Sequence, residues 1–204
     1  MTPFLGVLIA YLVGSIPSAY IAGKLRGVDL RQHGSGNLGA TNVVRVLGAR
    51  TGGVVFLADV LKGFLPVFLL PIYADTLQPD LWALVYGAAA ILGHVKPIFL
   101  LGRGGGKGVA TATGVFLALA FVPMLIAFAV WVVVFSTSRY VSLASLCGAA
   151  VLPIAIVALY RQPGAPVFIA SLIIAAFVFW THRANIARLR RGEEHRFVKK
   201  ETAA

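Results

Sequence analysis

A glycine-rich segment at residues 34–45 combines backbone freedom with side chains that bind anions. It reads GSGNLGATNVVR, with three glycines in its first six residues, and glycines let backbone N–H groups approach an anion closely. A helix that begins near Ala40 would carry Thr41 and Asn42 on its first turns. Arg45 follows them by four and three residues, so the three side chains would share one face. A helix N-terminus with an arginine beside it can bind a phosphate group. The alternative interpretation is a glycine-rich turn with a capping Ser or Asn.

A second glycine-rich segment surrounds Lys107 in the sequence GRGGGKG at residues 102–108. Glycines around a lysine that open directly into a helix make a cradle for phosphoryl oxygens. The segment is not a Walker loop, because Leu101 stands where that pattern needs glycine and Gly108 stands where it needs Ser or Thr. Taken alone, the segment could also be a flexible interhelical turn whose cations reach toward the membrane surface.

A third polar segment follows the last apolar stretch and begins at His182. Asn185 comes three residues later, so the two side chains would point the same way on a helix. A histidine at a membrane interface can relay a proton near neutral pH. The arginines that follow are typical of a basic helix end at the interface, and we expect the tail after Glu193 to be charged and frayed.

The acidic residues and the cysteine exclude several other chemistries. The seven acids form no paired cluster of the kind that holds magnesium, and Cys147 is the only cysteine, so we expect no metal and no cofactor. No histidine is followed five residues later by an aspartate, so the dyad of the common glycerolipid acyltransferases is absent. Asp59 and Lys62 lie in an apolar stretch, where we expect them to pair for a structural reason.

The elements that position these segments are membrane helices. The chain is 59% hydrophobic and 12% charged, which makes the bilayer its expected solvent. Lys plus Arg number 18 against 7 Asp plus Glu, a net charge of +11. On a membrane protein this excess indicates contact with anionic lipid and attraction of anionic substrates. Nucleic-acid binding is not expected, because no soluble domain is left over for it.

Apolar length and charge together predict seven spans. Five stretches are long and apolar, namely residues 3–23, 54–73, 81–101, 141–160 and 165–181. Residues 108–135 are too long for one ordinary span, and Pro123 makes them either one kinked helix or two short helices that turn back near residues 121–123. If residues 108–135 form two helices, all the basic clusters lie on one side of the membrane, as the positive-inside rule favours. These clusters are at 24–50, 96–107, 139 and 183–200. We therefore expect an all-α polytopic membrane protein, a single domain over residues 1–204, with seven transmembrane helices, an outside N-terminus and a cytoplasmic C-terminus.

The three segments together resemble the bacterial integral-membrane glycerol-3-phosphate acyltransferases that use acyl-phosphate as donor. The resemblance covers essentially the whole chain, through GSGNLGATNVVR at 34–45, GH at 93–94 with GGKGVAT at 105–111, and HRANIARL at 182–189. It implies an inner-membrane enzyme with a cytoplasmic active site. That enzyme would transfer a long-chain acyl group to the sn-1 hydroxyl of glycerol 3-phosphate and release lysophosphatidic acid and phosphate. Neither coenzyme A nor an acyl carrier protein would take part, and its other contacts would be membrane lipids, with no obligate protein partner.

The matched motifs also imply the site residues. Ser35, Lys107 and His182 are expected to carry the chemistry. The substrate-binding set is Gly36, Asn37, Thr41, Asn42, Arg45, Gly105, Gly106, Ser142 and Asn185. The second loop departs from the family pattern by one extra residue and a missing aromatic on its Arg103 side.

Acyl phosphate is already an activated mixed anhydride, so the enzyme needs mainly to align it and neutralise charge. The attacking hydroxyl must lose a proton, and the base is either His182 or the substrate's own phosphate. Ser35 has no base adjacent in sequence, which favours ligand binding over a covalent nucleophile. A phosphate or organic-anion transporter using the same anion sites is the alternative function.

Overall fold

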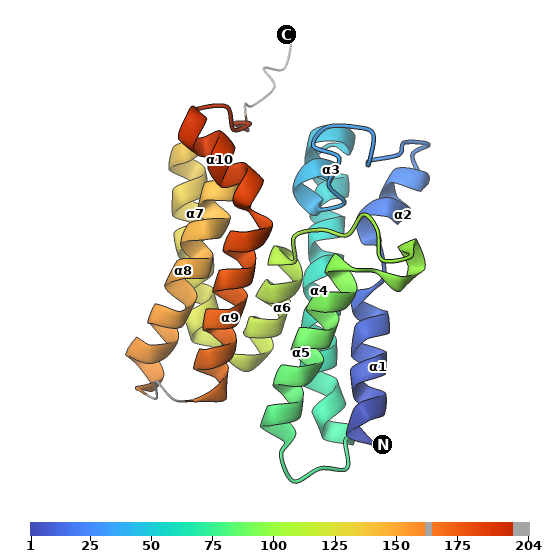
Figure 1. Cartoon of the computed structure of the whole chain (residues 1–204), viewed down its shortest axis with the longest axis vertical. Coiled ribbons are helices and arrows are strands. Elements are labelled where there is room, and N and C mark those ends of the chain that lie inside the picture. The colour runs from blue at the N-terminus through green and yellow to red at the C-terminus, as the bar shows by residue number, and fades with distance from the viewer. Residues whose placement is uncertain (162–164, 198–204) are drawn as a thin grey trace. The chain divides into compact units, whose positions relative to one another are not determined.

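The computed structural model describes residues 1–161 and 165–197, and every regular element in these residues is helical. The helices group into two compact units, Met1–Phe121 and Val122–Ala204 (Figure 1). Five segments are long and apolar enough to cross a membrane: Pro3–Lys24, Ala49–Tyr73, Pro79–Leu100, Phe121–Ser138 and Val141–Tyr160. A bent pair, Pro166–Thr181 with Arg183–Arg191, would be a sixth, and Val109–Leu119 is a shorter apolar helix.

The first unit contains most of the short elements. Its elements are α1 (Pro3–Gly14), α2 (Ser18–Lys24), α3 (Ala40–Leu47), α4 (Ala49–Tyr73), α5 (Pro79–Val95), the 3-10 turn η1 (Ile98–Leu100) and α6 (Val109–Leu119). The expected span at residues 3–23 is broken into α1 and α2, because Pro17 has no N–H to continue the helical ladder and adopts φ −88°, ψ 71°.

Glycines let the helices of this unit meet backbone to backbone. A Cβ added at Gly14 of α1 would overlap the carbonyl oxygen of Ala90 in α5, and one at Gly63 of α4 would overlap that of Thr111 in α6. Two further glycines make equally close approaches, Gly93 and Gly114. Small residues at such seams are how membrane helices associate, because lipid tails are as apolar as the side chains and give no hydrophobic drive.

A buried polar cluster lies among the helices of the first unit. Lys62 Nζ is 2.8 Å from Asp59 Oδ1, which confirms the expected pairing, and both side chains are buried. Lys62 also donates to the carbonyl of Ile16 at 2.9 Å, at the break between α1 and α2. His94 Nδ1 lies 3.7 Å from the same aspartate oxygen. The ion pair thus ties the α1–α2 break to α4 and brings His94 of α5 next to it.

The second unit is built from longer helices. It contains α7 (Phe121–Ser138), α8 (Val141–Tyr160), α9 (Pro166–Thr181) and α10 (Arg183–Arg191), the last two bent by 58° at His182. Residues 108–135 therefore fall into two helices, α6 and α7, as expected. The break lies at Ala120, whose φ of −150° and ψ of 69° end α6.

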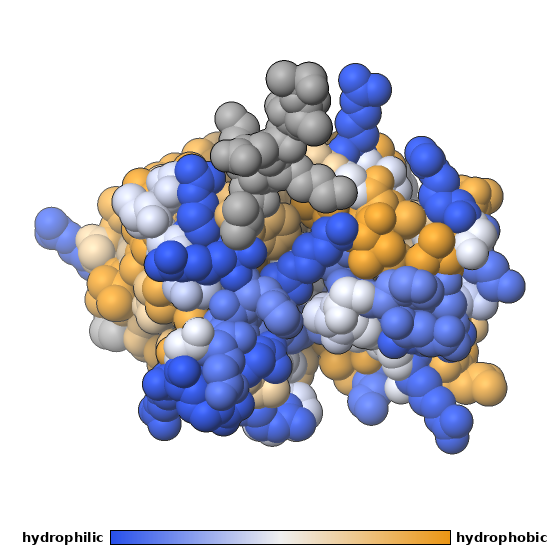
Figure 2. Space-filling view, turned by 90° about the horizontal axis from the view of Figure 1, so that it is seen from above, coloured by the Kyte–Doolittle hydropathy of each residue, from blue (hydrophilic) through white to orange (hydrophobic). Residues whose placement is uncertain are grey.

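In each unit the basic connections lie at one end. In the first unit the N-terminal amine donates to the carbonyl of Tyr73 at 2.7 Å, so the N-terminus lies beside the acidic α4–α5 connection. Residues 25–39 and 101–108 lie at the opposite end of that unit (Figure 1). In the second unit the N–H of Phe197 donates to the carbonyl of Arg139 at 3.0 Å, which brings the tail to the α7–α8 turn. Figure 2 shows hydrophilic side chains on these ends and hydrophobic ones around them.

Candidate functional site

Asn42 organises the first glycine-rich loop. Its Oδ1 accepts a hydrogen bond from the backbone N–H of Ser35 at 2.8 Å, and its Nδ2 donates to the carbonyls of His33 (3.0 Å) and Leu30 (3.2 Å). The side chain is 1% exposed. A Cβ at Gly34, where φ is +64°, would overlap Asn42 Oδ1. Glycine is therefore required here both by the backbone conformation and by the space.

The helix expected after this loop is present. Helix α3 begins at Ala40 with Gly39 at its N-cap, so the loop opens into a helix N-terminus. Thr41 lies half-buried in the first turn, whereas Ser35 and Arg45 are exposed. The segment thus presents a hydroxyl, a guanidinium and a helix N-terminus, the groups that bind a phosphate.

Asn37 has a buried acceptor in the middle of the loop. No donor among the described residues reaches its Oδ1, and a Cβ at Gly39 would lie 3.5 Å from that oxygen. Buried polar atoms are nearly always hydrogen-bonded in native proteins. This oxygen is therefore a candidate ligand-binding group.

The second loop is fixed by contacts with the end of α5. A Cβ at Gly105 would overlap the carbonyl oxygen of Val95, and one at Gly106 would overlap Nε2 of His94. Gly108 has φ +83° and is the N-cap of α6. Lys107 lies half-buried between these glycines. As expected, the lysine therefore stands directly before a helix N-terminus.

The two glycine-rich loops lie against each other within the first unit. A Cβ at Gly106 would lie 3.2 Å from the carbonyl oxygen of Leu38, and one at Gly104 would lie 3.4 Å from the Leu38 side chain and 3.5 Å from Cδ of Arg31. Segments that are 66 to 73 residues apart in sequence at these contacts thus form one polar surface. The expectation that they share a face is met in this unit.

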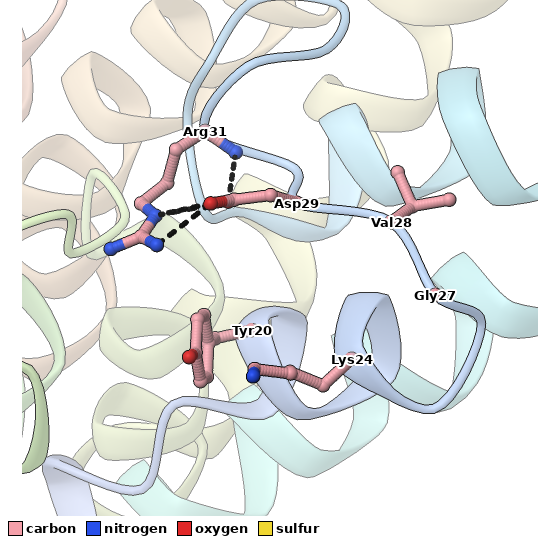
Figure 3. A pocket seen from close by; sticks show the side chains of 6 residues that line it. All are labelled: Tyr20, Lys24, Gly27, Val28, Asp29 and Arg31. Atoms are coloured by element: carbon pink, nitrogen blue, oxygen red, sulfur yellow. Dashed lines mark hydrogen bonds and ion pairs between the residues drawn. The ribbon is translucent and has the colours of Figure 1, made fainter.

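An open pocket beside the first loop was not expected from the sequence (Figure 3). Arg31 pairs with Asp29 through Nη2 and Oδ2 at 2.7 Å, and its guanidinium carbon lies 5.3 Å from the centre of the Tyr20 ring. The hydrogen bonds from Arg31 lower the pKa of Asp29 to about 2. In the sequence this pair is visible only as an acid and a base two residues apart, and such pairs are too common on protein surfaces to predict a pocket. The residues that line the pocket are Tyr20, Lys24, Gly27, Val28, Asp29 and Arg31.

His182 lies at the bend between α9 and α10 in the second unit. The side chain is 4% exposed, and Nδ1 lies 2.8 Å from the carbonyl oxygen of Val178. A carbonyl only accepts, so the hydrogen is assigned to Nδ1, and Nε2 is the ring nitrogen that carries the lone pair in the neutral form. This tautomer suits a group that takes a proton through Nε2.

A buried carboxylate gathers the polar residues of the second unit. Glu194 Oε1 accepts from Ser142 Oγ at 2.9 Å and from Asn185 Nδ2 at 2.7 Å, and Oε2 accepts from Arg188 Nε at 2.7 Å. Burial raises the pKa of Glu194, but the hydrogen bonds from Asn185, Arg188 and Ser142 outweigh it and leave the pKa below its usual value. The structure thus brings Ser142 and Asn185 together, as expected, through an acid that was not expected.

The tail that holds Glu194 is folded. Phe197 packs edge-on against Phe135 with ring centres 5.8 Å apart, and Arg196 lies over the Tyr140 ring at 5.1 Å. The expectation of a frayed tail is therefore wrong for residues 193–197, because these contacts close the tail over the α7–α8 turn. Residues 198–204 lie outside the described residues.

The predicted site residues thus fall into two sets. The first unit holds Ser35, Gly36, Asn37, Thr41, Asn42, Arg45, Gly105, Gly106 and Lys107. The second unit holds Ser142, His182 and Asn185. Sequence reasoning missed Glu194 and the Asp29–Arg31 pair.

Known proteins match this chain over nearly its whole length. The family model described as "Glycerol-3-phosphate acyltransferase" matches residues 4–192. A glycerol-3-phosphate acyltransferase of Geotalea daltonii is 47% identical over 194 residues, which cover 95% of this chain and 96% of the relative. One of Aquifex aeolicus is 45% identical over 192 residues, which cover 94% and 97%.

Two solved structures share the fold. The crystal structure of PlsY (YgiH), an integral membrane glycerol 3-phosphate acyltransferase, in its glycerol 3-phosphate form has a TM-score of 0.86 and 41% identity, covering 96% of each chain. Its lysophosphatidic acid form has a TM-score of 0.83 and 40% identity, covering 96% of this chain and 95% of the other. These matches confirm the resemblance drawn from the three motifs. The chain therefore belongs to the glycerol-3-phosphate acyltransferase family.

Proposed function

We propose that this protein transfers a fatty acyl group from an acyl phosphate to the sn-1 hydroxyl of glycerol 3-phosphate. The products are lysophosphatidic acid and inorganic phosphate. Membership of the family supports the acceptor and the reaction type. The acyl-phosphate donor is supported by the groups that the first unit offers to a phosphate.

The observation that carries the proposal is the contact between the two glycine-rich loops. Each loop opens into a helix, α3 or α6, and the loops approach each other at Leu38 and Gly106. Lys107 and Arg45 each contribute a positive charge to these two segments. A polar surface with two helix N-termini and two cations suits the phosphate of an acyl phosphate and its charge in the transition state.

The reaction is an acyl transfer that needs no external energy source. The sn-1 oxygen attacks the carbonyl carbon, the bond between that carbon and the bridging phosphate oxygen breaks, and phosphate leaves. We assign to Lys107 and Arg45 the neutralisation of charge on the phosphate and on the carbonyl oxygen as the tetrahedral state develops. Ser35, Thr41 and Asn37 supply further hydrogen bonds, with Gly36, Gly105 and Gly106 allowing the backbone to approach.

The proton of the sn-1 hydroxyl goes to one of two acceptors. The Nδ1–H of His182 is held by the Val178 carbonyl, which supports Nε2 as the general base. The phosphate of the substrate is the other acceptor. Mutation of His182 distinguishes these two acceptors.

Asn42 has a positioning role in this proposal. Its amide donates to two carbonyls and accepts from the Ser35 N–H, so it fixes the loop on which Ser35 lies. Ser142 and Asn185 are assigned to the acyl acceptor, and direct contact between Asn42 and substrate stays a prediction.

The proposal includes a single domain of seven spans with the basic ends in the cytoplasm. The shorter helix α6 and the bent pair α9–α10 supply the two spans beyond the five long ones. The N-terminus lies beside the acidic α4–α5 connection, which supports placing both outside. Cysteine labelling at Leu77 and at Arg190, which are both exposed, from opposite sides of sealed vesicles tests this orientation.

The reaction is tested by phosphate release from palmitoyl phosphate by the purified protein, with and without glycerol 3-phosphate. We expect release that depends on glycerol 3-phosphate and equals the lysophosphatidic acid formed. Palmitoyl coenzyme A in place of palmitoyl phosphate should give no product. Product from the coenzyme A ester alone would overturn the proposed donor. Anion uptake into liposomes without any acyl transfer would support the transporter instead.

A further inference from the structure

Glu194 contacts two of the residues that the proposed function assigns to the substrate. Its carboxylate lies within hydrogen-bonding distance of Ser142, Asn185 and Arg188, at 2.7 to 2.9 Å. The carboxylate side chain is 4% exposed, and Ser142 and Asn185 are also buried. The cluster is therefore a specific network and not a surface ion pair.

The direction of these hydrogen bonds decides what Ser142 can bind. A carboxylate has no hydrogen to give, so the Ser142 hydroxyl must donate its proton to Glu194, and the Ser142 oxygen keeps its lone pairs. The same reasoning orients the Asn185 amide, whose NH₂ faces the carboxylate. With its proton committed, the Ser142 oxygen acts as a hydrogen-bond acceptor.

An acceptor beside a carboxylate selects against a phosphate. Phosphate oxygens are themselves acceptors, so they would find no donor at the Ser142 oxygen, whose hydrogen is directed to Glu194. A neutral hydroxyl group fits, because it can donate to Ser142. Glycerol 3-phosphate carries two hydroxyls and acyl phosphate carries none. The hydrogen-bonding polarity of the network therefore suits a hydroxyl group of the acceptor substrate.

We propose that Glu194 is a positioning residue that makes Ser142 a hydrogen-bond acceptor for the middle hydroxyl of glycerol 3-phosphate. The middle hydroxyl is chosen because the sn-1 hydroxyl must direct its hydrogen to the base. This inference rests on the proposed function. It adds a determinant of acceptor specificity that lies in the folded tail.

The tail contacts explain how a residue beyond the last helix can be so placed. Gly192 ends α10 with φ +71°, which turns the chain back toward α8. The N–H of Phe197 then donates to the Arg139 carbonyl at 3.0 Å, and Arg196 covers Tyr140. Glu194 lies between the turn at Gly192 and these two contacts, so its carboxylate is held beside the first turn of α8.

The test compares glycerol 3-phosphate with 3-hydroxypropyl phosphate, which lacks only the middle hydroxyl. We expect the wild type to favour glycerol 3-phosphate by at least about tenfold in kcat/KM, as expected for one lost hydrogen bond in a polar site. Glu194→Gln, which can turn an amide N–H toward Ser142, should lose most of this preference. Its KM for palmitoyl phosphate should stay within about twofold of the wild-type value, since the acyl donor has no hydroxyl.

Two further variants sharpen the comparison. Glu193→Gln is the matched control, because Glu193 is the neighbouring acid and its pair with Arg191 is 57% exposed on both sides; it should keep the wild-type preference. Ser142→Ala should lose the preference as Glu194→Gln does. The double variant should be no worse than either single one, because both changes remove the same interaction.

The possible outcomes distinguish the role of Glu194 from the proposed acyl transfer. A wild type that forms no lysophosphatidic acid overturns the proposed function, and the inference falls with it. An active wild type whose preference survives in Glu194→Gln or in Ser142→Ala overturns the inference alone. An equal loss of kcat/KM for both acceptors in Glu194→Gln shows a merely structural role. Should Glu194→Gln fail to fold, the preference measured for Ser142→Ala decides.

Discussion

The two units bind their polar groups in opposite ways. In the first, the glycine-rich loops are shaped by backbone contacts and by the amide of Asn42, and the charged groups expected at the ligand are cations. In the second, Ser142 and Asn185 are held by a buried carboxylate, Glu194. The first design suits a charged phosphate and the second suits neutral hydroxyls. Together with the proposed function, the difference predicts that the two substrates are recognised by opposite hydrogen-bonding polarity.

The largest effect should come from removing Lys107, one of the two cations of the first unit that are assigned to the phosphate. Lys107→Ala should abolish transfer, a loss of at least about a thousandfold in kcat, because Lys107 is one of the two cations assigned to neutralise the leaving phosphate. Steady-state phosphate release measures it. Lys96→Ala, which removes an exposed lysine at the end of α5, is the matched control and should remain active. Near-normal turnover by Lys107→Ala would remove this residue from the site.

Changing His182 tests the second unit. His182→Gln should lower kcat by about a hundredfold if Nε2 is the base, with KM for both substrates little changed. A loss below about tenfold would assign the proton to the substrate's phosphate.

A glycine of the first unit gives a smaller, geometric effect. Gly106→Ala would place a methyl group against His94 Nε2, so the loop or the His94 ring must shift, and we expect a loss on the order of tenfold in kcat. Gly53→Ala in α4 is the control, since a Cβ there meets nothing within 4 Å. That control should keep its activity and gain about 0.5–1 kcal/mol in stability from its helix propensity. Equal activity of the two variants would show that the loop contact is dispensable.

The smallest expected effect is a pH dependence of stability in the second unit. The folded pKa of Glu194 lies below its ordinary value of 4.5, so its stabilisation is complete above pH 4.5 and is lost as the pH falls through the folded pKa. The thermal midpoint of the wild type should exceed that of Glu194→Gln at pH 7, and the gap should narrow below pH 4.5. Glu193→Gln should show no such narrowing.

Local signals in the sequence predicted much of the fold. The break near residue 120 and the helix that begins at Ala40 follow from apolar length, proline and glycine, all of which act within a few residues. The α1–α2 break had the same kind of signal in Pro17, but the apolar run on both sides concealed it. The glycine-rich loops could be paired only by assuming that both lie on one side of the membrane.

The part of the site that could not be predicted depends on distant contacts. Glu194 and Ser142 are 52 residues apart in sequence, and the tail contains three acids of which only Glu194 is buried in the described residues. A charged residue near a chain end is normally solvated. Only the turn at Gly192 and the anchors at Phe197 and Arg196 decide which acid reaches α8.

The close helix contacts at Gly14 and Gly63 of the first unit also affect how the protein responds to the surrounding lipid. The lipids that it helps to make change the thickness and fluidity of the bilayer in which it lies. Because α1 meets α5, and α4 meets α6, through backbone atoms, the spacing of these helices is set by the chain and not by the surrounding acyl chains. Substitutions among the lipid-facing side chains should therefore leave the separation of the two glycine-rich loops unchanged.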